Sequence, residues 1–151
     1  MRCLLNLQII FIFLFILGGA VPPVKANSTS STDKIFKGEY DSEIKQIVLD
    51  TSQQINNQLP MMIDEETRFD FSMALNKQLH LKYTMINSEN NEMDIEHFKI
   101  KTKNYLLKNQ CRNKNMKILL SLGIEYFYNY FDKDGDIIAS IKIGFDECNS
   151  N

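Results

Sequence analysis

The stretch that decides the predicted fold is "RFDFSMALNKQLHLKYTMI", Arg68–Ile86. In each half, apolar side chains alternate with polar or small ones, which is typical of a strand with one buried and one solvated face. The alternating apolar residues are Phe69, Phe71, Met73 and Leu75, then Leu79, Leu81, Tyr83 and Met85. Because "NKQ" between the halves favours a turn, the stretch predicts a β-hairpin.

A second hairpin is predicted near the C-terminus, from "IEYFYNYF" (124–131) and "IIASIKIGF" (137–145). One face would carry Ile124, Tyr126, Tyr128 and Tyr130, and then Ile137, Ala139, Ile141, Ile143 and Phe145. Tyrosines at this spacing favour a packing face over a ligand-stacking ladder. The linking "DKDGD" resembles a calcium loop but lacks the EF-hand glycine at position six and glutamate at position twelve, which indicates a turn.

Helical periodicity surrounds the two hairpins. "YDSEIKQIVLDTSQQINNQL" predicts a helix of about 17 residues with one apolar stripe, capped by Asp41 or Ser42 and ended by Pro60. A second helix, capped by Asn91 or Asp94, is expected up to Cys111, and a short third one would end at Gly123. The sequence therefore predicts one α+β domain, residues 39–151, with helices packed on one face of a four-stranded antiparallel sheet in the order α-β-β-α-α-β-β.

The N-terminus is typical of an export signal. Arg2 precedes an apolar run from Leu4 to Val21, and "VKA" ends at Ala26, so residues 1–26 are predicted to be cleaved. The alternative is an uncleaved membrane anchor, against which Pro22–Pro23 and the small-residue site argue. Residues 27–38 would be a flexible leader, and the protein would reach the periplasm or the medium.

Charge and cysteine content agree with export. Of 17 basic residues two lie in the signal, which leaves 15 against 19 acids. This acidic balance argues against nucleic acid or an anionic membrane as a partner. Only Cys111 and Cys148 remain after cleavage, and two cysteines in an oxidising compartment most simply form one disulfide. The alternative, a reactive thiol pair, lacks the C-x-x-C spacing.

No motif predicts a metal, a cofactor or a catalytic set. His80 and His97 have no second ligand at zinc spacing. There is no glycine-rich phosphate loop and no G-x-S-x-G motif, although a Ser-His-Asp set assembled only in space stays open. The segment "LPMMIDEETRFD", Leu59–Asp70, reads as a corner that holds an Arg68–Asp70 ion pair. Its alternative is a glycosidase-like carboxylate pair, which lacks an apolar pocket.

The chain also resembles a family of small exported bacterial proteins. The resemblance lies in "LPMMIDEETRFD", "LHLKYTMIN", Cys111, "LGIEYFYNYFDKDGDIIASIKI" and Cys148, and its first block follows the pattern LPMM[VI]DxxTRxD. It implies an exported α+β domain with a Cys111–Cys148 bond and no assigned activity. Lys82 departs from the pattern, which has an aromatic residue or Asn there. If the first block recurs as a unit, Asp64, Thr67, Arg68 and Asp70 become binding candidates.

The resulting hypothesis is a non-enzymatic binding module of the envelope or medium, with an unknown protein or small ligand as its partner. Its contact surface would be the solvated sheet face. The candidate residues are Arg68, Asp70, His80, Lys82 and Thr84 on that face, with Asp64 and Thr67 beside it. Two alternatives remain: a small hydrolase using the carboxylates Asp64–Asp70 near His80, and an immunity or inhibitor protein directed against an envelope toxin.

Overall fold

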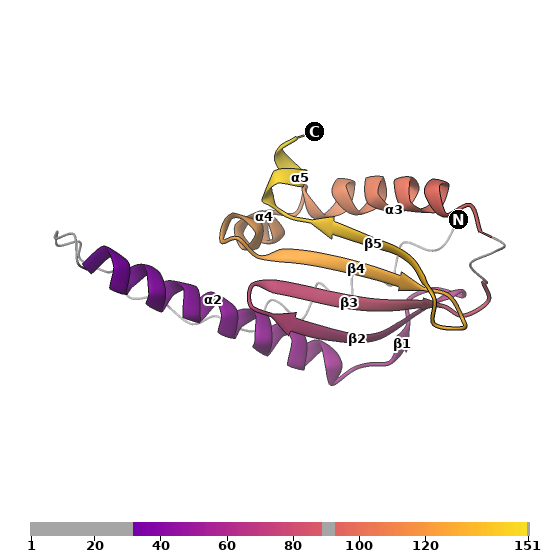
Figure 1. Ribbon diagram of the computed structural model, residues 1–151, viewed down its shortest axis with the longest axis horizontal. Coiled ribbons are helices and arrows are strands. Elements are labelled where there is room, and N and C mark those ends of the chain that lie inside the picture. Colours follow the sequence, from indigo (N-terminus) through magenta and orange to yellow (C-terminus); the bar gives the residue numbers. More distant parts are fainter. Residues whose placement is uncertain (1–31, 89–92, 151) are drawn as a thin grey trace. The chain divides into compact units, whose positions relative to one another are not determined.

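The computed structural model describes residues 32–88 and 93–150, with side chains from Glu39 onward (Figure 1). The chain divides after Asp41 into two units, and the sheet and most of the helices belong to the second, Ser42–Asn151. The predicted signal peptide lies outside the described residues. Among the helices that are described, none has the length and apolar character needed to span a membrane.

Helix α2 runs from Thr32 to Asn56 and is longer than its apolar stripe suggests. It begins within the segment that was expected to be a leader, and it ends before the cis peptide bond between Leu59 and Pro60. From Ser42 on, its buried residues Ile44, Val48 and Ser52 recur every four positions. This spacing places them on one side of the helix, which packs against the sheet.

The sheet is mixed and has five strands, so the prediction of four antiparallel strands was wrong in detail. The strands are β1 (Met61–Met62), β2 (Thr67–Leu75), β3 (Gln78–Met85), β4 (Glu125–Phe131) and β5 (Ile137–Ile143), in that spatial order. Both predicted hairpins form, as the antiparallel pairs β2–β3 and β4–β5. The strands β3 and β4, however, are parallel.

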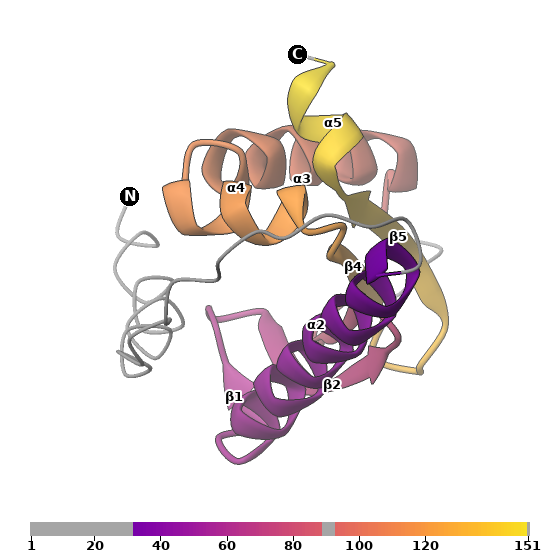
Figure 2. The same ribbon diagram turned by 90° about the vertical axis from the view of Figure 1, so that its left-hand side faces the viewer.

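The parallel pair follows from the connection between the hairpins. Helices α3 (Ile95–Gln110) and α4 (Lys114–Ser121) return the chain to the end at which β3 began. A parallel neighbour requires such a crossover, usually a helical one. Asp94 caps α3 by accepting a hydrogen bond from the His97 amide, and Asn113 caps α4 in the same way. Figure 2 shows α3 and α4 together on one side of the sheet.

The C-terminal end is tied to the crossover by a disulfide. A short helix, α5 (Phe145–Asn149), follows β5 and was not predicted. Its Cys148 is bonded to Cys111 at the end of α3, with the two Cα atoms 5.3 Å apart, which confirms the predicted bond. The "DKDGD" segment is a turn, as expected. Asp132 accepts hydrogen bonds there from the amides of Asp134 and Asp136, and Gly135 has a φ of 92°.

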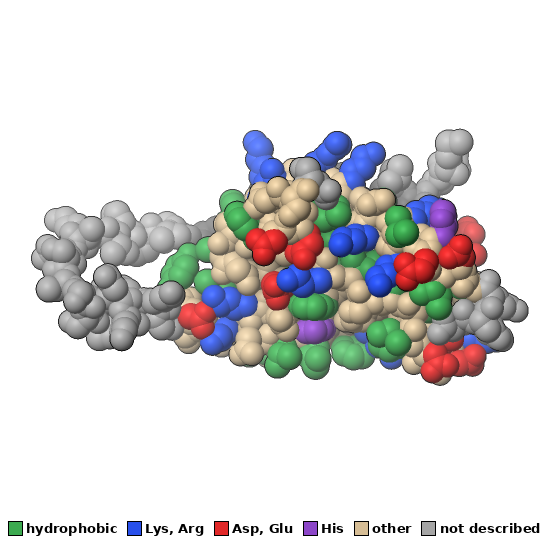
Figure 3. Space-filling model, turned by 45° about the horizontal axis from the view of Figure 1, so that its top comes forward, with side chains coloured by type: hydrophobic (Ala, Val, Ile, Leu, Met, Phe, Trp, Pro, Cys, Tyr) green, Lys and Arg blue, Asp and Glu red, His purple; other side chains and the backbone are tan. Residues whose placement is uncertain are grey.

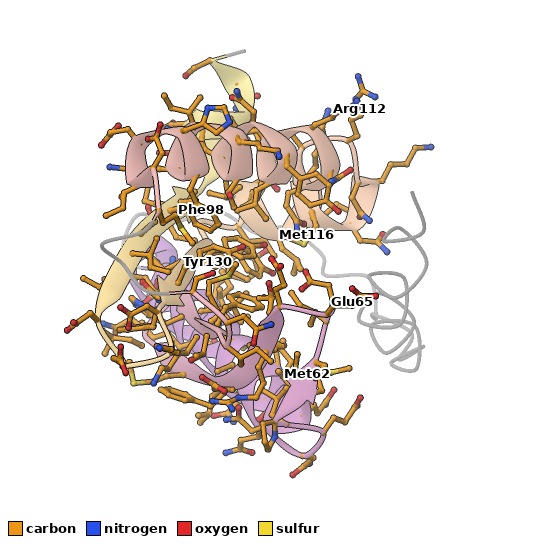
Figure 4. All side chains as sticks on the ribbon, turned by 90° about the vertical axis from the view of Figure 1, so that its right-hand side faces the viewer. Met62, Glu65, Phe98, Arg112, Met116 and Tyr130 are labelled. Atoms are coloured by element: carbon orange, nitrogen blue, oxygen red, sulfur yellow. A yellow bond between two sulfur atoms is a disulfide. The ribbon has the colours of Figure 1, made fainter. Side chains whose placement is uncertain are left out.

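The face of the sheet that packs on the helices is termed the core face. Its residues are Phe69, Ser72, Ala74, Leu79, Leu81, Tyr83, Met85, Tyr126, Tyr128, Tyr130, Ala139, Ile141 and Ile143. Tyr83 stacks on Phe69 and on Tyr130, with ring centroids 4.6 and 5.1 Å apart. Phe98 of α3 meets Tyr130 edge-on (Figure 4). The tyrosine series is therefore a packing face, as predicted.

Burial in this aromatic layer changes the acidity of its phenols. It raises the pKa of Tyr126 from 10.0 to about 12. Burial also raises the pKa values of Tyr83, Tyr128 and Tyr130, because it removes water from the hydroxyls. Neighbouring phenols add to the rise at Tyr83 and Tyr128, and the charge of Asp64 adds to it at Tyr130. The phenols of the layer are thus uncharged throughout the physiological pH range.

One predicted face assignment in β5 was wrong. A register shift between Tyr130 and Phe131 lets both Ile138 and Ala139 be buried. Ile137 is consequently 56% exposed, and Phe145 lies beyond the strand in α5, where it is 52% exposed. A bulge of this kind breaks the strict alternation on which the assignment relied.

Candidate functional site

The strand β2 contains an irregularity that reverses its alternation. Phe69 pairs with Tyr83 and Phe71 pairs with Lys82, so Asp70 is an extra residue with no opposite partner. Before this bulge odd positions face the core, and after it the even positions do. Phe69 is therefore 2% exposed, whereas Phe71 points to the other side and is 46% exposed. The prediction that Phe69 and Phe71 share a face was wrong.

The opposite side of the sheet is termed the open face. Its residues are Arg68, Asp70, Phe71, Met73, Leu75, Gln78, His80, Lys82, Thr84, Glu125, Phe127, Asn129, Phe131, Ile137, Ser140 and Lys142. Phe71, Met73 and Leu75 form a row along β2, and each is about half exposed. Figure 3 shows hydrophobic side chains gathered in a row along the lower edge of its view. Contiguous exposed apolar surface of this kind is typical of interaction sites.

Small residues on the core side of β2 explain why the reversal is stable. After the bulge the residues turned inward are Ser72 and Ala74 rather than the large apolar ones. Ser52 of α2 meets Ser72 there, with the two hydroxyl oxygens 2.9 Å apart. A large side chain at position 72 would hold the helix away from the strand. Close contact between α2 and β2 therefore needs the apolar side chains to face outward.

The free edge of β2 is closed by a side chain. Asn56 at the end of α2 accepts a hydrogen bond from the Ser72 amide at 2.6 Å and donates one to the Ser72 carbonyl at 2.8 Å. The carboxamide thus satisfies the two backbone groups that a neighbouring strand would otherwise bind. Proteins commonly protect edge strands from pairing with other chains. Contact through this part of the molecule is consequently expected over the open face and not along the edge.

The predicted ion pair lies on the open face. Arg68 donates from Nε to the Asp70 carboxylate, and the Thr84 hydroxyl donates to its other oxygen. The Arg68 side chain is 44% exposed, while that of Asp70 is only 14% exposed. The bulge places the Asp70 carboxylate between its two partners, which fixes the guanidinium above the sheet.

Two further predicted residues lie against phenyl rings of the open face. His80 stacks on Phe127 with ring centroids 4.6 Å apart and is 3.3 Å from the Gln78 amide oxygen. The Lys82 ammonium lies 4.8 Å from the ring centroid of Phe131 and 5.8 Å from that of Phe71. Within the described part of the chain no carboxylate pairs with Lys82. Its charge is held over aromatic rings and directed to solvent.

Asp64 and Thr67 are not part of this arrangement. The Asp64 carboxylate accepts hydrogen bonds from the amides of Glu66 and Thr67 at 2.9 and 2.7 Å, so it holds the turn before β2. Thr67 is buried, and its hydroxyl is 3.5 Å from the sulfur of Met85. Both residues build the corner, and the structure brings neither beside His80 or Lys82.

One end of the open face carries an ion-pair cluster. Lys142 donates to Glu125 at 2.8 Å and lies 3.8 Å from Glu147 of α5, while Gln78 donates to the second Glu125 oxygen at 3.0 Å. The Lys142 ammonium, through its hydrogen bond, is the main cause that lowers the Glu125 pKa below 4.5. Glu125 in turn raises the pKa of Lys142. The cluster is a structural clamp between β4, β5 and α5.

The groups on the open face are suited to contact with a partner. In residues 32–88 and 93–150 no group of three potential metal ligands comes together. Asp64 and Asp70 both accept hydrogen bonds that hold the backbone or Arg68, so each has a structural use. Beside the ion-paired Arg68 and Lys142, the face presents apolar area with the Lys82 ammonium over two phenyl rings. This arrangement is suited to a partner with apolar and acidic groups.

The apolar residues of this face were missed by the sequence prediction. A signal for them exists in β4, whose "YFYNYF" segment carries aromatic residues at both odd and even positions. A strand that is solvated on one face has no need of Phe127 and Phe131 there. Aromatic content on both faces indicates a second apolar surface, although it does not reveal the bulge that adds Phe71.

Neither a family model nor a curated protein matches the chain. Solved structures do share its fold. A Pseudomonas aeruginosa protein predicted to be secreted aligns with a TM-score of 0.63 at 17% identity, covering 72% of this chain and 96% of its own. The pilotin EpsS of the Vibrio vulnificus type II secretion system gives 0.61 at 11%, covering 74% and 96%. The pilotin AspS of the Vibrio cholerae system gives 0.58 at 16%, covering 74% and 98%.

Proposed function

We propose that this chain is an exported, non-enzymatic binding module of the cell envelope and that it contacts a protein partner through the open face of its sheet. The observation that carries the proposal is the row Phe71, Met73 and Leu75, whose side chains are about half exposed. Burying such a side chain fully stabilises by about 1.5–3 kcal/mol. Because each side chain is already about half buried, the fold leaves about half of this gain unused, and a partner that covers the row would obtain the rest.

The solved structures with the same fold support the location. Two of the three are pilotins of type II secretion systems, and the third comes from a protein predicted to be secreted. At 11–17% identity the likeness extends to the fold and not to individual residues. Together with the signal-like N-terminus and a disulfide at Cys111–Cys148, it favours an oxidising compartment outside the cytoplasm.

The polar residues of the open face would give the contact its selectivity. Lys82 is a cation without a carboxylate partner in the described chain, and it projects over Phe71 and Phe131. A partner that covers these rings would desolvate the ammonium and must supply an acidic group to it. We therefore expect the bound segment to combine apolar side chains with a carboxylate opposite Lys82.

The alternative of a carboxylate-dependent hydrolase has weaker support. Asp64 holds the corner through backbone amides, and Asp70 is paired with Arg68 and Thr84. The immunity hypothesis would use the same open face, so it differs from the main proposal only in the identity of the partner.

The test is site-specific photocrosslinking in the cells that express the protein. A benzophenone amino acid replaces Met73 in one variant and Leu49 of α2 in a matched control, since both side chains are exposed, at 49% and 41%. Irradiation should give an adduct of discrete mass at position 73 and none at position 49. In the Lys82→Glu background the adduct at position 73 should weaken at least about tenfold, because a carboxylate would then repel the acidic group of the partner.

Two results would sink the proposal. One is an equal pattern of adducts at positions 73 and 49, which would indicate unspecific collisions. The other is an unchanged adduct at position 73 in the Lys82→Glu variant. A hydrolase would instead be indicated if Asp64→Asn abolished turnover of an envelope substrate while the purified variant kept its wild-type unfolding transition.

A further inference from the structure

The crossover between the two hairpins has a charge unlike that of the rest of the chain. Residues 95–121, which contain α3 and α4, carry seven basic residues and one acid, a net charge of +6. The basic residues are Lys99, Lys101, Lys103, Lys108, Arg112, Lys114 and Lys117. The remaining residues hold ten basic side chains and 18 acids, a net charge of −8. The overall charge of −2 conceals this separation, so the whole-chain balance does not exclude an anionic partner at the crossover.

These cations are exposed and uncompensated. All seven side chains are exposed to solvent. In the described chain none of them has a carboxylate within ion-pair distance, whereas Arg68 and Lys142 elsewhere do. Like charges at such density repel one another and destabilise the helices that carry them. An arrangement that raises the energy of the free protein favours an anionic surface as its counterpart.

Two of the four lysines of α3 lie on its outer side. Lys101 and Lys108 share one face of the helix with His97 and Asn104, whereas Lys99 and Lys103 lie nearer the side of Leu106 and Gln110. Arg112 follows the C-cap Cys111 and lies just beyond the helix. Leu106 and Gln110 on the opposite face are buried toward the sheet. Figure 4 shows Arg112 pointing away from the sheet, and Figure 3 shows Lys and Arg side chains projecting from the top of its view. Lys101, Lys108 and Arg112 thus face outward, away from the open face.

Isolated apolar side chains lie among the cations. Ile100 and Ile118 are each 59% exposed, the highest fraction among the large hydrophobic side chains of the described chain. Ile100 stands between Lys99 and Lys101 in the sequence, and Ile118 follows Lys117. Tyr105 on α3 is exposed as well, at 41%. Helices that lie on membranes combine lysines with a few apolar anchors in this way.

The choice of lysine over arginine distinguishes a lipid surface from an acidic protein. Six of the seven cations are lysines, which are strongly hydrated point charges on flexible stems. Lysine is depleted at protein–protein interfaces, where arginine provides bidentate recognition. A diffuse layer of anionic headgroups requires no fixed geometry and attracts each lysine separately.

We infer that the outer surface of α3 and α4 binds the face of an anionic phospholipid bilayer, with Ile100 and Ile118 entering the headgroup region. This site lies on helices that cover the core face, so it is independent of the proposed partner contact on the open face. A protein bound to lipid through α3 and α4 would direct its open face away from the bilayer.

The test is co-sedimentation of the purified chain from Asn27 onward, which contains every described element, with lipid vesicles. Vesicles of phosphatidylglycerol and phosphatidylethanolamine are compared with vesicles of phosphatidylcholine alone. We expect at least about tenfold stronger binding to the anionic vesicles, because each lysine near such a surface adds about fivefold in affinity. Lys101→Glu/Lys108→Glu should lose at least about tenfold. The matched control Lys45→Glu/Lys133→Glu makes the same change in net charge at exposed positions outside the crossover and should lose much less.

Circular dichroism and thermal unfolding curves verify that each variant is folded. If the charge-reversal variant Lys101→Glu/Lys108→Glu does not fold, the charge-neutralising variant Lys101→Gln/Lys108→Gln takes its place. Equal binding to both vesicle types would overturn the inference, as would equal losses in the two double variants. Binding to soluble polyglutamate without binding to anionic vesicles would overturn it in favour of an acidic protein. Failure here would leave the crosslink at position 73 unaffected, so the two proposals are tested separately.

Discussion

Phe69 and Phe71 are the same residue type two positions apart on one strand, yet they belong to different regions of the molecule. Phe69 is 2% exposed and stacks on Tyr83, while Phe71 is 46% exposed on the open face. The single extra residue Asp70 causes the difference by reversing the alternation. The comparison teaches that the core face accounts for the stability of the fold, whereas the apolar side chains of the open face are available for contact with a partner.

The largest expected effect comes from the two phenylalanines themselves. Phe69→Ala should lower the free energy of unfolding by about 3–5 kcal/mol, because it leaves a cavity in the aromatic layer. Phe71→Ala should lower it by less than about 1 kcal/mol, since half of the ring is already in water. Urea denaturation measures both values. Equal losses would show that the two faces do not differ in the way described.

Removing the disulfide should have the next largest effect on the free energy of unfolding, and it separates the stability of the fold from contact through the open face. Cys111 and Cys148 enclose a loop of 37 residues and join helices α3 and α5. Replacing both with serine should cost roughly 3–4 kcal/mol on the chain-entropy model. At temperatures below its lowered unfolding midpoint, the double-serine variant should still form the photocrosslinking adduct at position 73, because the disulfide lies outside the open face. A change of under about 1 kcal/mol would argue against the bond as a main constraint on the unfolded chain.

The edge of β2 provides a smaller effect. Asn56→Ala removes both hydrogen bonds to the Ser72 backbone, at a cost of about 1–2 kcal/mol. It also opens an edge next to an apolar row, so the variant should self-associate at concentrations where the wild type is monodisperse. Analytical ultracentrifugation and urea denaturation measure the two effects. Asn57→Ala, at an exposed neighbouring position, is the control. Identical stability and self-association of the two variants would show that Asn56 does not protect the edge of β2.

The ion-pair cluster should give the smallest effect. Glu125→Gln should change the free energy of unfolding by no more than ~1 kcal/mol, because Lys142 is 40% exposed and solvent screens the pair. The folded state lowers the Glu125 pKa below 4.5, so the contribution is present above that pH and is lost as the pH falls through the lowered value. Unfolding curves at pH 7 and pH 3 should therefore differ more for the wild type than for Glu125→Gln. A larger difference in the variant would contradict the assigned direction.

The sequence predicted features that depend on local pattern. Both hairpins and the tyrosine layer follow from alternation and turn residues close together in the chain, and Asp94 is one of the two caps that the sequence offered for α3. The Arg68–Asp70 pair also follows, since the two residues are neighbours on one strand. The disulfide was predictable because Cys111 and Cys148 are the only cysteines left in the predicted mature chain.

The features it did not predict depend on distant parts of the chain or on single extra residues. The parallel pairing of β3 and β4 is set by the path of the crossover helices, which strand patterns do not encode. The bulge at Asp70 leaves the apolar spacing of "RFDFSMAL" unchanged, so the exposure of Phe71, Met73 and Leu75 is invisible in the sequence. Asp64 and Thr67 became binding candidates because they share the LPMM[VI]DxxTRxD block with Arg68 and Asp70, although they build the corner before the open face.

The most direct test of the central claim measures stability and contact in the same variant. Phe71→Ser/Leu75→Ser removes two members of the exposed apolar row and leaves position 73 free for the photocrosslinking residue. We predict that the free energy of unfolding stays within about 1 kcal/mol of the wild type while the adduct at position 73 falls at least about tenfold. An undiminished adduct in a stable variant would contradict the claim, and so would a loss of several kcal/mol, which would assign these side chains to the core.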